Sequence, residues 1–282
     1  MPDDLSAIVS GEAERLGTGY TFTEGPLWHP DGYLLFVDVR ESRLYRFFPG
    51  QRPFVVREDT GGGNGLTLDR QGNVLMCQGG LRRVVRLDAN WNDTVVADKW
   101  DGKRLNRPND VVCRSDGSIY FTDPGMRVPA EEREIDVSGV MRVAPDGSVH
   151  LATSECEYPN GLAFSPDERL LYVANSRPDK YIRAFDVAAD GSLSNSRVFA
   201  DMTAPEEEVP DGMKVDTAGN VFCTGPGGTW VFNSAGNRLG IIKTPEVPAN
   251  LSFGGSDCRT AFLTARTSVY TLRVKTPGVR TG

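Results

Sequence analysis

The sequence contains only two histidines, His29 and His150. His29 directly follows Trp28 in a predicted turn, and His150 lies in a predicted outer strand. Neither belongs to the polar motifs that recur along the chain. A Ser-His-Asp triad or a histidine general base therefore has little support.

The sequence also lacks the cysteine patterns of disulfide-rich domains and zinc sites. Its five cysteines are odd in number, widely spaced and include no Cys-x-x-Cys pair. This spacing argues against a disulfide framework and against structural zinc. We expect buried thiols in strands. The five are Cys77, Cys113, Cys156, Cys223 and Cys258.

Long apolar runs and basic stretches are missing as well. No segment approaches the roughly 18 apolar residues of a membrane span, and residues 1–4 are acidic where a signal peptide would be basic. The formal charge is -7 without a Lys/Arg stripe, which argues against a nucleic-acid surface. We therefore expect a cytoplasmic protein that binds neither membrane nor nucleic acid. It is a monomer by default, with a dimer left open.

What the sequence does contain is a repeat. A polar anchor precedes an apolar run and, seven residues later, a turn, as in Asn160 and Asp167. Successive anchors lie 40, 45, 51, 51 and 39 residues apart, which fits one small supersecondary unit per repeat. The six anchors are Glu24, Asn64, Asn109, Asn160, Asp211 and Asn250.

Each repeat predicts four strands. In the first, residues 26–28 open the unit, the runs 33–38 and 43–47 follow, and residues 54–56 close it. Pairs such as Asp146-Gly147 lie where the third and fourth strands must be joined. Without a convincing amphipathic helix, the six units predict an all-β, six-bladed β-propeller with four antiparallel strands per blade. It would form a single domain over residues 1–282.

The last repeat has too few residues for its own fourth strand. The segment after Leu272 is short and ends in a stretch rich in proline and glycine, whereas residues 11–20 precede the first repeat and have no other role. We expect this N-terminal segment to close the last blade. Closure would remove the open blade edges that invite aggregation.

Propeller geometry places the anchors together. The first strand of each blade lines the central channel, so the six anchors should meet at one mouth. Residues fourteen positions later, such as Asp38 and Asp123, end the second strand and return to that face. The charged loop at residues 124–138 emerges there too, either as a lid or specificity loop or as a solvated insertion.

The ring of anchors offers oxygen donors without sulfur or imidazole, a set that suits a hard divalent cation. Polar residues at strand starts could instead satisfy local backbone groups, an alternative that weighs most for Asn64 and Asn250. Glu24 has no turn role between Thr23 and Gly25. A carboxylate buried there without a cation would be costly.

Six ordered motifs resemble those of a known family, the SMP-30/gluconolactonase (regucalcin-like, LRE-like) family. The resemblance covers nearly the whole chain and implies a propeller with one divalent metal, bound by Glu24, Asn160 and Asp211. The motifs are Thr23-Glu24-Gly25-Pro26-Leu27-Trp28, Leu105-Asn106-Arg107-Pro108-Asn109-Asp110, Tyr120-Phe121-Thr122-Asp123-Pro124, Pro159-Asn160-Gly161-Leu162-Ala163, Pro210-Asp211-Gly212 and Asn250-Leu251-Ser252-Phe253-Gly254-Gly255.

The resemblance also implies individual roles. Asn109 is similar to the family residue that contacts substrate and the metal shell, and Arg107 to the one that holds substrate oxygens. Asp211 resembles the family's proton donor and acceptor. Glu134 and Asp123 are both candidates for an acidic substrate contact. By ligand type the cofactor would be Ca2+, with Mg2+, Mn2+, Zn2+ and Fe2+ left open.

The expected reaction is metal-dependent hydrolysis of a sugar-derived lactone, such as gluconolactone, to the aldonic acid. The metal would polarise the carbonyl and stabilise the oxyanion, while Asp211 would deprotonate the attacking water and return the proton to the ring oxygen. Two alternatives stay open. One is a phosphotriester or organophosphate hydrolase on the same metal site. The other is a non-catalytic calcium-binding propeller scaffold.

Overall fold

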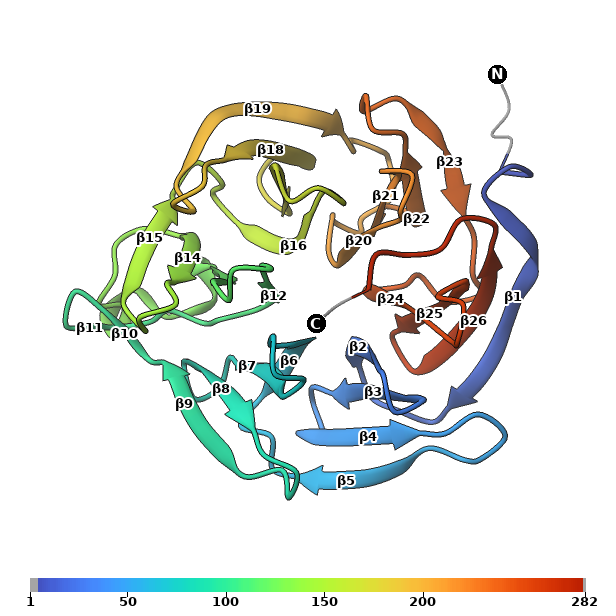
Figure 1. Ribbon diagram of the computed structural model, residues 1–282, viewed down its shortest axis with the longest axis horizontal. Helices are drawn as coiled ribbons and strands as arrows, with labels where there is room; N and C mark the ends of the chain where they lie inside the picture. The colour runs from blue at the N-terminus through green and yellow to red at the C-terminus, as the bar shows by residue number, and fades with distance from the viewer. Residues whose placement is uncertain (1–4, 281–282) are drawn as a thin grey trace.

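Six antiparallel sheets of four strands each form a ring in the computed structural model, which describes residues 5–280 (Figure 1). The predicted all-β, six-bladed propeller is confirmed. In each sheet the first strand lies nearest the central axis and the last lies at the rim. The prediction against a signal peptide was based on residues 1–4, which lie outside the described residues.

The first three blades follow the chain in order, and the third is preceded by a short extra ribbon that the sequence does not predict. Their strands are β2 (Thr23–His29), β3 (Tyr33–Asp38), β4 (Arg43–Phe47), β5 (Phe54–Glu58), β6 (Gly63–Leu68), β7 (Val74–Gln78), β8 (Arg83–Leu87), β9 (Asp93–Ala97), β12 (Val111–Cys113), β13 (Ile119–Asp123), β14 (Gly139–Val143) and β15 (Val149–Thr153). The ribbon pairs β10 (Lys99–Trp100) with β11 (Lys103–Arg104).

The remaining blades repeat the plan, except that the sixth takes its outer strand from the N-terminal segment. Their strands are β16 (Pro159–Phe164), β17 (Leu170–Asn175), β18 (Tyr181–Val187), β19 (Leu193–Asp201), β20 (Met213–Val215), β21 (Val221–Gly225), β22 (Gly228–Phe232), β23 (Arg238–Ile242), β24 (Asn250–Gly254), β25 (Thr260–Ala265), β26 (Ser268–Val274) and β1 (Val9–Thr18).

The apolar second strands follow from blade-on-blade packing. Alternate residues of β3 face opposite neighbours: Leu34 and Phe36 join a core with Phe262 of the sixth blade. Leu35 and Val37 instead belong to a core shared with the second blade. Because both faces of the strand are covered, a continuous apolar run replaces the alternation of a half-exposed strand.

Strand β1 closes the ring as predicted. It pairs antiparallel with β26, from Val9 opposite Val274 to Thr18 opposite Ser268. Figure 1 shows it at the rim, outside β26. The strand spans residues 9–18, two positions earlier than the predicted 11–20.

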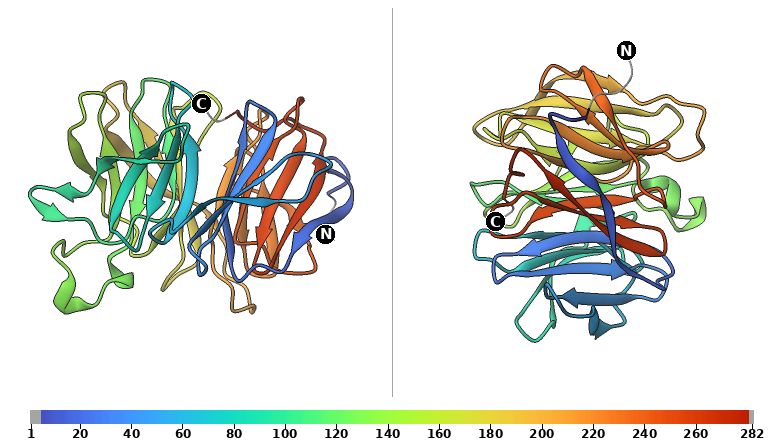
Figure 2. Two further views of the ribbon diagram at one scale, coloured as in Figure 1. Left: turned by 90° about the horizontal axis from the view of Figure 1, so that it is seen from below. Right: turned by 90° about the vertical axis from the view of Figure 1, so that its right-hand side faces the viewer.

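The two faces of the ring are different. The loop between β13 and β14 occupies residues 124–138 and contains two short 3-10 turns, η1 (Gly125–Arg127) and η2 (Ala130–Glu132). Figure 2 shows this loop at one face and the C-terminal segment at the other. That segment attaches to the fifth blade, where the Val279 amide donates to the Val215 carbonyl at 3.0 Å. In the described part of the chain, no helix is long and apolar enough to cross a bilayer.

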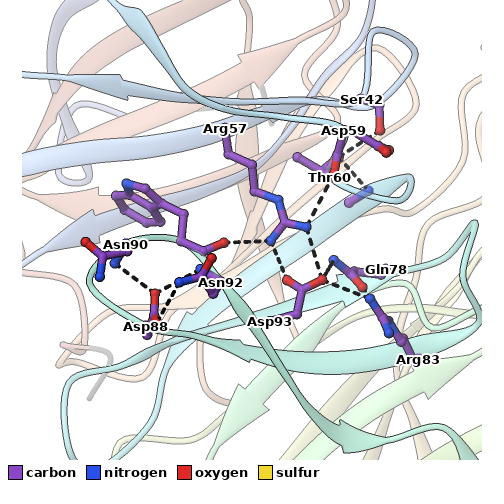
Figure 3. Close-up of polar contacts among 12 residues, drawn as sticks. Ser42, Arg57, Asp59, Thr60, Gln78, Arg83, Asp88, Asn90, Asn92 and Asp93 are labelled. Atoms are coloured by element: carbon purple, nitrogen blue, oxygen red, sulfur yellow. Dashed lines mark hydrogen bonds and ion pairs between the residues drawn. The ribbon is translucent and has the colours of Figure 1, made fainter.

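An ion-pair network joins the first two blades near the rim (Figure 3). The Asp93 carboxylate on β9 accepts from Arg57 of β5, with Nη2 at 3.0 Å, and from Arg83 of β8 at 2.8 Å. Gln78 donates to the same carboxylate at 3.1 Å. Burial alone would raise the pKa of Asp93, but the hydrogen bonds from Arg57 and Gln78 outweigh it and lower the pKa.

Asp93→Ala should destabilise the protein by about 2 kcal/mol, because it removes the carboxylate that two half-buried guanidinium groups share. Urea unfolding measures the change. Asp186→Asn is the control, since its pair with Arg197 is exposed and lies within one blade. We expect a much smaller shift from the control. Equal shifts for the two variants would show that the network stabilises the protein no more than an exposed ion pair does.

Candidate active site

The six anchors lie at or just before the inner strands, as the repeat predicts. Five of them are at most 8% exposed, and only Asp211 is more open. Asp211 lines a pocket of about 480 Å3 at this face. The anchors therefore surround the central axis, with one carboxylate facing a space that a small molecule can enter.

Hydrogen bonds connect three anchor amides in series. Asn64 Nδ2 donates to Asn109 Oδ1 at 2.7 Å, and Asn109 Nδ2 donates to Asn160 Oδ1 at 2.8 Å. Asn160 Nδ2 donates to Ser176 Oγ at 3.0 Å, and the Ser176 hydroxyl donates to the Pro210 carbonyl at 2.6 Å. The series fixes the orientation of each amide. It leaves the Asn160 oxygen a second lone pair for a ligand.

Glycine after an anchor lets neighbouring inner strands approach. A Cβ at Gly161 would lie 2.2 Å from the Asp211 carbonyl oxygen, and one at Gly25 would lie 2.0 Å from that of Asn64. Gly25 also has a φ of 53°, which favours glycine. The anchor-glycine pairs are thus a visible signal in the sequence for close packing at the axis.

Residues at the ends of second strands hold the segments that lead to the anchors. Asp38 accepts from the backbone amides of Thr21 at 2.7 Å and Phe22 at 3.1 Å. Asp123 accepts equivalently from Asn106 at 2.8 Å and Arg107 at 2.7 Å. In both blades the two donors lie three and two residues before the anchor. These carboxylates therefore fix where Glu24 and Asn109 lie.

This position favours a supporting role for Asp123 over the substrate contact that the sequence predicts. Its side chain is 0% exposed. Burial raises the pKa of Asp123 to about 6, against the opposing effect of the amide hydrogen bonds. Glu134 is exposed, and its Oε2 accepts from the Arg104 amide at 2.7 Å. That bond also favours local support, and a substrate contact by Glu134 stays a prediction.

Three residues of interest lie here that the sequence does not assign. Asp110 is 2% exposed and lies near both Glu24 and Asp211, whose pKa values its charge raises. Ser176 ends the amide series. Arg127, on η1, donates through Nε to the Tyr158 hydroxyl and lies over its ring at 5.5 Å. Asp110 directly follows an anchor, and Arg127 lies in the charged loop that the sequence places at this face, whereas Ser176 had no such signal.

Glu24 and Asp211 share a poorly solvated space. Burial raises the pKa of Asp211 to about 7, although Arg127 lowers it in part. Burial and the Asp211 charge raise the pKa of Glu24 well above its usual range, against a hydrogen bond from the Gly25 amide at 2.9 Å. Two carboxylates so placed resist being ionised together unless positive charge is brought between them.

This donor set fits a divalent cation. Among residues 5–280, no cluster of three or more His, Cys, Asp and Glu side chains is placed to hold a metal, so an ion here needs amide oxygens. Glu24 and Asp211 offer carboxylates, and Asn160 offers an oriented amide oxygen. Oxygen-only sets of this kind are typical for calcium, magnesium and manganese.

Comparisons with known proteins agree with this geometry. Residues 22–267 match the model of the SMP-30/Gluconolactonase/LRE-like region. The chain belongs to this family. The match spans the first anchor to the last, so every inner strand described above lies within it.

Individual family members are similar over most of their length. A gluconolactonase from Zymomonas mobilis is 32% identical, covering 97% of this chain and 85% of that protein. A pentonolactonase from Haloferax volcanii is 31% identical over 86% of this chain and 80% of that protein. A solved gluconolactonase structure from Xanthomonas campestris superposes with a TM-score of 0.89 at 32% identity, covering 96% of this chain and 92% of that one.

The metal-stripped protein should lose stability as the pH rises from about 4, the ordinary carboxyl pKa, through the Asp211 pKa of about 7. In that range the folded protein binds more protons than the unfolded chain, so the free energy of unfolding falls with pH. Thermal unfolding in EDTA should therefore give a lower Tm at pH 8 than at pH 5.5. Added Ca2+ should raise the Tm more at pH 8, by several degrees.

Glu24→Gln is the matched variant for this measurement. Asp110 and Asp123 also have raised pKa values and contribute with the same sign, so the difference from the parent protein isolates the pair. The variant should show a weaker pH dependence and a smaller response to Ca2+. A parent Tm that responds to neither pH nor cation would contradict a shared carboxylate site.

Proposed function

We propose that this protein hydrolyses a sugar-derived lactone in a reaction that requires a divalent cation. One observation carries the proposal: the Asp211 carboxylate lies near enough to Glu24 to raise its pKa, and it also lines a pocket of about 480 Å3. That volume suits a small ligand. Full-length similarity to a gluconolactonase and a pentonolactonase supports the lactone as substrate class.

Glu24, Asn160 and Asp211 would hold the cation, Ca2+ by ligand type. A divalent cation bound there would supply Lewis-acid activation of the lactone carbonyl. Asn64 and Asn109 keep the Asn160 amide oriented through the hydrogen-bonded series. Asp38 and Asp123 support the same site by accepting hydrogen bonds from the backbone segments that precede Glu24 and Asn109.

Asp211 is the proposed proton carrier. Its side chain lines the pocket, so its carboxylate can accept a proton from a water molecule there and donate it again. It would take a proton from the attacking water as that oxygen bonds to the carbonyl carbon. The proton then goes to the ring oxygen when the ester bond breaks, which gives the hydroxy acid.

Arg107 and Asn109 are proposed to bind the substrate. Their backbone is fixed by Asp123 and by the bond from the Asn109 amide to the Thr122 carbonyl at 2.9 Å. The Arg107 side chain is exposed at this face, next to Gly79, where a Cβ would lie 3.1 Å from Arg107 Cγ. Its guanidinium can therefore reach ligand oxygens without desolvation of a buried charge.

Asp211→Asn should lower kcat for D-glucono-1,5-lactone at least about 100-fold, because an amide cannot carry the proton. The assay follows acid release with a pH indicator on metal-stripped protein supplied with Ca2+, Mg2+, Mn2+, Zn2+ or Fe2+. Asp167→Asn is the matched control. Asp167 lies in an exposed turn between β16 and β17, at the end of β16 opposite to the anchor Asn160. Its turnover should equal that of the parent.

Near-parental turnover by Asp211→Asn would remove Asp211 from the mechanism. A phosphotriester tested in parallel separates the competing enzyme: cleavage of the triester with no lactone hydrolysed would replace the lactonase proposal. Binding of Ca2+ with no turnover of either substrate class would favour the scaffold.

A further inference from the structure

The pocket beside Asp211 is rich in arginine. Arg40, Arg177 and Arg266 line it together with Asp211 and Glu208. All three arginine side chains are exposed toward solvent. None of them belongs to the motifs from which the sequence predicts the site.

The propeller topology explains how they meet. Arg40 follows the end of β3 by two residues, Arg177 follows the end of β17 by two, and Arg266 directly follows β25. The ends of second strands lie at the same face as the anchors. Three blades that are distant in sequence therefore each contribute one arginine side chain to the same mouth of the channel.

The backbone at these positions is held in place. The Arg266 carbonyl accepts from the Thr23 amide at 2.7 Å, next to Glu24. The Arg177 carbonyl accepts from Asn175 Nδ2 at 3.1 Å. Beside Arg40, the Val39 amide donates to the Phe22 carbonyl at 2.9 Å. Because their bases are fixed, ordering these side chains around a ligand costs less than on a mobile loop.

Two of the three guanidinium groups have no acidic partner. Arg266 pairs with Glu208 at 3.0 Å. Within residues 5–280, no carboxylate lies within ion-pair distance of Arg40 or Arg177, and Arg40 instead lies over the Phe22 ring at 5.5 Å. The whole chain has a formal charge of -7, so this local excess of positive charge runs against its average. Unpaired arginines lining a concave site are suited to an anion.

We propose that the preferred lactone carries an anionic group, a carboxylate or a phosphate, remote from the lactone carbonyl, and that Arg40 and Arg177 bind it. This inference rests on the proposed lactonase function. The ester is hydrolysed as described above, and the anionic group passes unchanged into the product. The planar guanidinium donates two parallel hydrogen bonds to either anion, which a neutral hydroxyl cannot accept in the same way.

The test compares lactones matched in ring size and different in charge. D-glucaro-1,4-lactone, with a carboxylate, is paired with D-glucono-1,4-lactone. 6-Phospho-D-glucono-1,5-lactone is paired with D-glucono-1,5-lactone. Spontaneous hydrolysis is subtracted, and the divalent cation is kept in excess over the substrate. We expect kcat/KM to be at least about tenfold higher for the anionic member of one pair or of both, and the pair identifies the anion.

The double variant Arg40→Gln/Arg177→Gln tests the residues. It should lower the anionic-to-neutral ratio of kcat/KM about tenfold or more, mainly through KM. Arg169→Gln, whose 84% exposed side chain belongs to a turn between β16 and β17, is the charge-matched control and should leave the ratio unchanged. Raising the salt concentration should weaken the preference in the parent, because exposed charges are screened.

The outcomes distinguish failure of the anion site from failure of the proposed lactonase function. Neutral lactones hydrolysed as well as both anionic ones, or a preference that survives the double variant, would overturn the anion site and leave the lactonase intact. Hydrolysis of none of the four lactones with any cation would overturn the proposed function itself. A preference that the double variant abolishes and the control retains supports both.

Discussion

The close approach of two carboxylates, the buried Glu24 and the half-buried Asp211, is the constraint on which the rest of this site depends. Each raises the cost of ionising the other, and burial raises the pKa of both. Such a pair is stable when protonated or when positive charge is supplied. The repulsion that makes the metal-free site sensitive to pH would be relieved by a divalent cation, so it favours cation binding there.

The repeated blade brings this pair together, and equivalent positions in different blades perform the same task. Asp38 and Asp123 both end a second strand, and both accept two backbone amides. They hold the segments that lead to Glu24 and Asn109. One repeat position thus supplies the proposed ligands, while another supplies the carboxylates that hold the backbone leading to them. A substitution at a supporting carboxylate would therefore shift an anchor without replacing it.

Most of the fold follows from the sequence, because the anchor spacing and the apolar second strands are local signals. The run Tyr33–Asp38 is both the predicted and the observed strand. The supporting role of Asp123 was not predictable in the same way, since it depends on which backbone amides face a buried carboxylate. Arg177 was missed because a loop positions it, and its neighbours in the pocket belong to other blades. Arg127 lies in the loop that the sequence places at this face, but its contact with Tyr158 was not predicted. The local sequence pattern predicts which face of the propeller holds the polar residues. Contacts between blades decide which of these side chains faces the pocket.

The central claim is that the converging inner strands build one cation site from Glu24, Asn160 and Asp211. Isothermal titration calorimetry of metal-stripped protein with Ca2+ and Mn2+ tests it most directly, with Asn160→Ala beside the parent. We predict one ion per chain, with affinity lowered at least about tenfold in the variant, because the amide oxygen is a ligand. Absence of stoichiometric binding in the parent, or equal affinity in the variant, would contradict the account.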